Sequence, residues 1–132
     1  MAVSEEVLDH TLDLFRALGP IRIARMFAGV GLFVEEDVMF GMITSDGTIF
    51  LKSDDSLTPR FLDAGSEPFT YSRTSGPQRV MSYMSLPDSA LDDPSEAVTW
   101  ARLALPPARE AAVKKRAEKA RKAARKAAKA GG

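Results

Sequence analysis

Residues 21–52 contain most of the strand-forming residues of the chain, in three closely spaced runs at 21–34, 38–43 and 48–52. Polar turns separate these runs, and the second turn contains an Asp46-Gly47 pair. An Asp-Gly pair between two β-rich runs favours a tight hairpin, because both central residues of such a turn need positive φ. The stretch therefore predicts a β-meander of adjacent antiparallel strands, around which the rest of the chain must fold.

Helical patterns lie on both sides of this meander. Residues 4–18 carry apolar side chains at helical spacing, with Ser4 as a candidate N-cap and Gly19-Pro20 as a stop signal. A short helix at 53–64, two strands near 69–72 and 79–84, and a helix from Pro94 to about Leu105 follow. This order, α-β-β-β-α-β-β-α, predicts an α+β fold with two layers: a five-stranded antiparallel sheet with helices on one face, plus a basic C-terminal helical tail.

Charge is distributed very unevenly along the 132 residues. Residues 1–108 contain 8 Lys and Arg against 16 Asp and Glu, a net charge of −8, whereas residues 109–132 contain 10 against 2, a net charge of +8. A basic end on an acidic body is typical of an arm that meets an anionic partner. We predict one domain at residues 1–106 and a basic tail rich in Ala, Lys and Arg at 107–132, helical or disordered.

The start of the chain and its apolar runs bear on its location. The first six residues are acidic where a secretory signal would be basic, and no apolar run approaches the roughly 18 residues that span a bilayer. The chain has no cysteine, which excludes disulfides, thiolate nucleophiles and cysteine-ligated metals. We expect a soluble, cytoplasmic protein with no membrane partner.

Several short segments along the body stand in an order and spacing typical of one known family. They are RMFAGVG at 25–31, MF at 39–40, IFLK at 49–52, FLDAGSEPFTY at 61–71, VMSY at 80–83, LP at 86–87, LDD at 91–93 and Trp100. Together these segments resemble the N-terminal domain of the TfoX/Sxy proteins. The resemblance implies the same two-layer α+β fold, a bacterial cytoplasmic setting and a link to regulators of natural competence. Those regulators act on transcription with a cyclic-AMP-responsive activator, and they carry a second helical domain where this chain has its basic tail.

Isolated polar residues predict no catalytic, cofactor or metal site. His10 is the single histidine, and together with Asp13 it cannot supply the about four ligands that zinc requires. Asp54-Asp55 and Asp92-Asp93 could act as paired carboxylates, but both pairs precede predicted helices, where capping is the better interpretation. Gly29-Val30-Gly31 lacks the third glycine of a dinucleotide loop, which favours close strand packing. We therefore predict no enzymatic activity and no cofactor.

Two groups of side chains leave alternatives open. The methionines of the strand regions could line a ligand cavity or a partner surface, or could simply fill the core; they are Met26, Met39, Met42, Met81 and Met84. Basic residues in or beside the strands could form an anion-binding patch, or could be solvated charge pairs; they are Arg22, Arg25, Lys52, Arg73 and Arg79.

The tail gives the clearest functional signal. Its Ala, Lys and Arg residues are strong helix formers, and on a helical wheel its alanines occupy one side. Eight cations occupy the other side as candidate nucleic-acid contacts: Lys114, Lys115, Lys119, Arg121, Lys122, Arg125, Lys126 and Lys129. A cationic stripe suits phosphate backbones, and the absence of Asn, Gln and aromatic residues from the tail predicts non-specific binding.

Other partners remain open at this point. The tail could instead be solvated or folded back on the acidic body. The protein could also be a protein–protein interaction domain, a homodimer or a partner of a transcription regulator, with no role in nucleic-acid binding.

Overall fold

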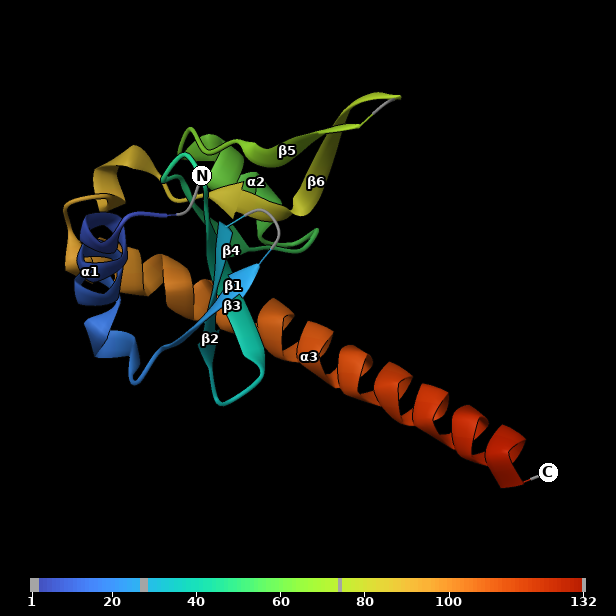
Figure 1. Cartoon of the computed structure of the whole chain (residues 1–132). Coiled ribbons are helices and arrows are strands. Elements are labelled where there is room, and N and C mark those ends of the chain that lie inside the picture. The colour runs from blue at the N-terminus through green and yellow to red at the C-terminus, as the bar shows by residue number, and fades with distance from the viewer. Residues whose placement is uncertain (1–2, 27–28, 74, 132) are drawn as a thin grey trace.

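A computed structural model of the chain describes residues 3–26, 29–73 and 75–131. The helices are α1 (Glu5–Leu14), α2 (Thr58–Asp63) and α3 (Pro94–Gly131), with single-turn helices η1 (Arg16–Leu18) and η2 (Asp88–Ala90). The strands are β1 (Arg22–Met26), β2 (Gly29–Val34), β3 (Val38–Thr44), β4 (Ile49–Lys52), β5 (Pro68–Arg73) and β6 (Gly76–Ser85). In Figure 1, α3 crosses the sheet and then continues far beyond the rest of the molecule.

The strands form one antiparallel sheet in the order β1-β2-β3-β4-β6-β5, which confirms the α+β class and the meander. The predicted number of five strands is wrong, because the run at 21–34 supplies two strands, β1 and β2, with Met26 opposite Gly29. From Met26 to Val34 the run is apolar on both faces and has no Asp-Gly signal, so its pattern hides the reversal. Phe27 and Ala28, in the middle of the run, lie outside the described residues.

The core lies between the sheet and the helices. Its fully buried side chains on four neighbouring strands are Leu32, Ile43, Leu51 and Met84. Each helix adds aromatic or small residues to the same cluster: the Phe15 ring, just after α1, meets Phe40 edge-on at 5.5 Å, and Phe61 of α2 stacks on Trp100 of α3 at 4.6 Å. The three helices therefore share one face of the sheet, as the sequence predicts.

Helix α3 packs against β3 and β4 through a row of small residues. The buried alanines of this row recur every three or four positions and are Ala97, Ala101, Ala104, Ala108 and Ala112. Small side chains allow the helix to lie close to the strands. The predicted end of this helix near Leu105 is wrong, because α3 continues through Pro106 and Pro107. The domain boundary at 106/107 stays a prediction, and the helix runs across it.

The turn between β2 and β3 adopts an unusual backbone conformation. Glu35 and Glu36 have φ values of 50° and 70°, which cost non-glycine residues about 1–2 kcal/mol each. Basic side chains bind this turn from two directions, since Arg22 of β1 donates to the Glu36 carbonyl at 2.7 and 3.2 Å and Arg109 of α3 binds the Glu35 carboxylate. Contacts from distant parts of the chain therefore hold a conformation that the local sequence disfavours.

Gly29 provides a test of how β2 approaches β3. A Cβ on Gly29 would lie 1.9 Å from the Ile43 carbonyl oxygen, and its φ is +152°. Because Gly29→Ala adds both a clash and backbone strain, we expect it to lower the free energy of unfolding by about 3 kcal/mol or more. Urea denaturation measures the loss.

Gly65→Ala is the matched control for this substitution. Gly65 also has positive φ, +87°, but no atom lies within 4 Å of the added Cβ. The control should therefore lose only about 1–2 kcal/mol. Equal losses in the two variants would contradict the close approach of β2 to β3.

Candidate nucleic-acid interface

Helix α3 changes character along its length. Its residues up to Ala112 alternate between buried and exposed positions against the sheet, whereas every residue from Val113 to Ala130 is exposed. The name "tail helix" is used below for residues 113–130. Because it continues the helix that forms part of the core, its direction relative to the body is set by the packing of the alanine row.

Two ion pairs join α3 to the β2–β3 turn where the tail helix begins. The part of α3 from Arg109 to Arg116 is called the root of the tail helix below. Arg109 donates to the Glu35 carboxylate at 2.5, 3.0 and 3.2 Å, and Arg116 donates to Asp37 at 2.6 and 3.1 Å. The hydrogen bonds from these guanidinium groups, followed by burial and the charges, set the pKa values: the Glu35 and Asp37 carboxyl groups have a pKa below their ordinary values. Both carboxylates are thus held ionised opposite α3.

These ion pairs were missed by the sequence analysis, although a signal for them exists. Arg109 and Arg116 are seven residues apart, which places them two turns apart on one side of a helix. That side is not the side of the eight predicted cations. Two arginines off the stripe at this spacing could match two acids, but the acids lie more than 70 residues earlier, and only the fold identifies them as Glu35 and Asp37.

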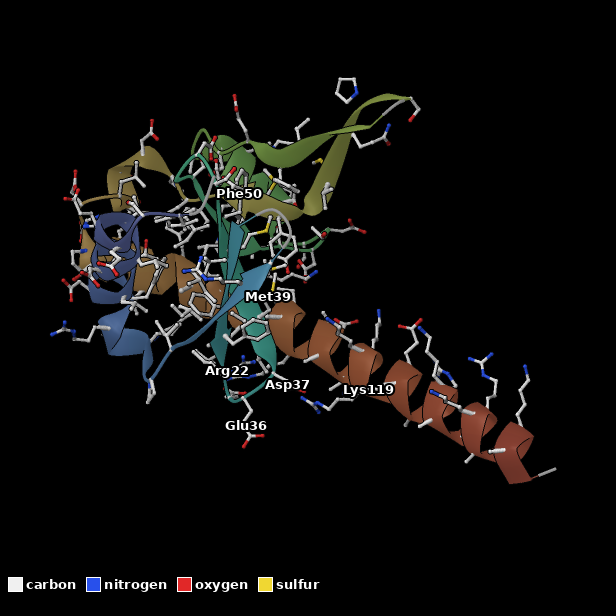
Figure 2. All side chains as sticks on the ribbon, viewed as in Figure 1. Arg22, Glu36, Asp37, Met39, Phe50 and Lys119 are labelled. Carbon is white, nitrogen blue, oxygen red and sulfur yellow. The ribbon has the colours of Figure 1, made fainter. Side chains whose placement is uncertain are left out.

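All eight predicted cations lie on α3 and are exposed. Lys114 forms an ion pair with Glu110 at 3.4 Å, one turn earlier. Along the described part of α3, the other seven form no ion pair with an acid, and this group comprises Lys115, Lys119, Arg121, Lys122, Arg125, Lys126 and Lys129. In Figure 2, the part of α3 that carries Lys119 extends beyond the sheet. The tail helix therefore offers a row of cations without internal partners.

The methionines of the strands, for which the sequence left two interpretations open, divide between the core and the surface. Met42 and Met84 are buried, whereas Met26 and Met39 lie with Phe33 and Tyr83 around a hollow of about 170 Å³ beside α3. Met81, in turn, is an exposed position on β6. Core filling is thus confirmed for Met42 and Met84, whereas a ligand or partner role for Met26 and Met39 stays a prediction.

The basic patch is likewise only partly assembled. The Arg22 guanidinium lies 4.4 Å from the centre of the Phe33 ring, and the Lys52 ammonium lies 4.8 Å from the centre of the Tyr83 ring. Arg25 is exposed on β1, and the side chains of Arg73 and Arg79 lie outside the described part of the structure. Two of the five basic residues therefore flank the aromatic rings near the root of the tail helix.

The remaining candidates have structural roles. The His10 Nε2–H group donates to the Leu91 carbonyl at 2.9 Å, which ties α1 to the segment before α3. Asp93 accepts from the Glu96 amide at 3.2 Å and caps α3, as predicted. Asp54 accepts from the Leu57 amide at 2.9 Å in the turn before α2, whose N-cap is Leu57 and has no side-chain cap, so the predicted cap of α2 is wrong. Within the described residues, no cluster of His, Cys, Asp or Glu could hold a metal ion.

Comparison with family models tests the family resemblance that the short sequence segments indicate. The model of the TfoX N-terminal domain matches residues 13–108. The chain belongs to the TfoX N-terminal domain family. Comparison with curated proteins found no match. The match ends at Ala108, so this TfoX N-terminal domain covers the sheet and the packed part of α3, and the tail helix lies beyond it.

Over the residues that the structure describes, none of the helices is both long enough and apolar enough to cross a bilayer.

Acidification should loosen the root of the tail helix. Because the folded state lowers the pKa of the Glu35 and Asp37 carboxyls, their stabilising effect is complete above the ordinary values of 4.5 and 3.8 and is lost as the pH falls through and below them. The protection of α3 amides near Arg109 and Arg116, which is the intrinsic exchange rate at each pH divided by the measured rate, should therefore fall between about pH 6 and pH 3 more than the protection near Ala101. The double variant Glu35→Gln, Asp37→Asn should show low protection at these amides at both pH values, and an unchanged pH response in this variant would contradict the assignment.

Proposed function

We propose that this TfoX N-terminal domain protein is a non-enzymatic regulatory module of the cytoplasm, and that its tail helix binds the phosphate backbone of nucleic acid. The observation that supports this proposal most directly is the row of seven cations without acidic partners on a helix anchored in the core. A preformed helix loses little conformational freedom on binding, and each neutralised phosphate releases counterions. Family membership supports the regulatory part of the proposal, because the family's name is that of regulators of natural competence.

The character of the contact follows from the residue types. Lys and Arg reach phosphate oxygens, and the tail helix carries no Asn, Gln or aromatic side chain, so its contacts are expected mainly with the backbone. Binding should therefore be insensitive to sequence and steeply dependent on salt. Such an interface holds the domain on nucleic acid and leaves the choice of site to a partner, such as a transcription regulator.

Neutral substitutions on the stripe test this function. The triple variant Lys119→Gln, Lys122→Gln, Lys126→Gln keeps good helix formers and leaves the core untouched, because all three side chains are exposed. We expect weaker binding to a duplex, with the slope of log K against log salt reduced by about 2 to 3. Fluorescence anisotropy with a labelled duplex at several salt concentrations measures both quantities.

A control with the same change in net charge separates the stripe from a general charge effect. The variant Arg16→Gln, Arg60→Gln, Arg102→Gln removes three exposed cations from the body. Its affinity and salt slope should stay close to those of the unmodified chain. If both triple variants bind alike, the tail helix is not the interface.

A second candidate function is protein–protein interaction without nucleic acid. One specific observation favours it: β1 is an edge strand of the sheet and exposes Ile23 and Met26, at 41% and 40%. An exposed strand edge can pair with a strand of another chain or of a second copy. Light scattering of the full chain without nucleic acid discriminates, because a stable dimer that persists in high salt would favour this function.

A further inference from the structure

The hollow beside the root of the tail helix is built by distant parts of the chain. We call it the root hollow, and its apolar lining comes from Met26, Phe33, Met39 and Tyr83, closed on one side by Ala111 and Lys115 of α3. These residues belong to β1, β2, β3, β6 and α3, and the volume is about 170 Å³. Met26 is 40% exposed, so the hollow opens to solvent next to the first cations of the tail helix.

The absence of a side chain at Gly31 shapes this lining. A Cβ on Gly31 would lie 2.8 Å from the Met26 sulfur, 3.2 Å from the Met39 sulfur and 2.9 Å from the Phe33 ring. Glycine therefore lets two thioethers and one ring gather over the middle of β2. Methionine is flexible and polarisable and packs favourably on aromatic rings, so this lining suits a flat aromatic ligand.

Positive charge surrounds the root hollow. The Arg22 and Lys52 head groups lie against the Phe33 and Tyr83 rings at 4.4 and 4.8 Å, and Lys115 lies on the rim. Burial, followed by the charge of Lys114, lowers the pKa of Lys52, which forms no ion pair with the described residues. An anion placed near these lysines would relieve their repulsion.

Two of the acids near this charge already have basic partners. Asp37, which also lines the root hollow, is bound by Arg116, and Glu110 is paired with Lys114. The ligand that fits is therefore flat and aromatic, and it is attached to an anionic chain that can continue along the lysines of the tail helix.

We propose that the root hollow accepts an unstacked base of a single-stranded nucleic acid whose phosphates follow the cations of the tail helix. This inference rests on the proposed function and extends it from backbone binding to a preference for single strands. In a duplex the bases are paired and stacked, so they cannot enter the hollow. Aromatic side chains beside a cationic groove are the usual combination for binding single strands without sequence specificity.

The test compares oligonucleotides that differ only in their bases. Anisotropy is measured for the full chain with a single strand of about 12 nucleotides and with an abasic strand of the same length and charge. We expect the strand with bases to bind roughly tenfold more tightly, the gain expected from one stacked base. A 2-aminopurine placed within the strand should also change its emission when it enters the hollow, which requires no protein variant.

Two matched substitutions on α3 locate the effect. Ala111→Leu fills the root hollow without changing charge, whereas Val113→Leu enlarges a side chain that is 56% exposed on the same helix. Ala111→Leu should reduce binding of the strand with bases to the abasic level and leave duplex binding unchanged. Val113→Leu should bind as the unmodified chain does, and thermal unfolding confirms that both variants are folded.

The outcomes separate the two proposals. Equal affinity for the strand with bases and the abasic strand, with binding to both intact, would overturn the base site while leaving the tail helix as a backbone interface. An unchanged 2-aminopurine emission has the same meaning and would leave the hollow to an apolar side chain of a protein partner. If the full chain binds no oligonucleotide at low salt, the proposed function fails and the base site fails with it.

Discussion

The close packing of the alanine row of α3 on β3 and β4 is the contact on which the rest of this structure depends. It closes the core, since Ala101 and Ala104 are fully buried in the same cluster as Phe61. It also determines where the cationic part of the same helix leaves the body. A larger side chain in this row would push the helix from the sheet and would disturb both the fold and the direction of the tail helix.

Charge is arranged on this framework so that the basic end cannot neutralise itself. The carboxylates of the β2–β3 turn bind Arg109 and Arg116, which lie off the stripe, and the stripe itself points elsewhere. Many other acids of the body lie on α1 and in the loops near η2, at the opposite end of α3 (Figure 1). A chain of zero formal net charge thus presents a cationic surface to its surroundings. Exposed charges of this kind act over about a Debye length, which explains why salt is the natural variable in the binding experiments.

Local signals in the sequence predicted much of the fold. The hairpin at Asp46-Gly47 forms, although only Gly47, at φ +87°, has the positive φ that was expected of both residues. Ser4 and Asp93 cap their helices. The sequence failed where distant contacts overrule local preference. Proline normally interrupts a helix, yet α3 continues through Pro106 and Pro107 because buried alanines before and after them pack on the sheet. The reversal between β1 and β2 lies within a uniformly apolar run.

The candidate site divides in the same way. Helical spacing alone was enough to place the eight cations on one side of a helix. The root hollow could not be predicted, because periodicity does not show that residues near positions 26, 33, 39, 83 and 111 meet at one place. Similarly, nothing local distinguishes Met39, which lines the hollow, from Met42, which is buried in the sheet.

The strained β2–β3 turn also has a mechanical consequence. Because Glu35 and Asp37 hold the helix at Arg109 and Arg116, the turn acts as the fulcrum of a lever whose free arm is formed by residues 117–130. At 1.5 Å per residue this arm is about 21 Å long, so a rotation of about 10° at the turn would displace its tip by about 4 Å. That displacement is close to the axial rise per phosphate of one duplex strand, about 3.4 Å. A small rearrangement of two acidic residues would thus be sufficient to shift the distant lysines by about one phosphate along the proposed ligand.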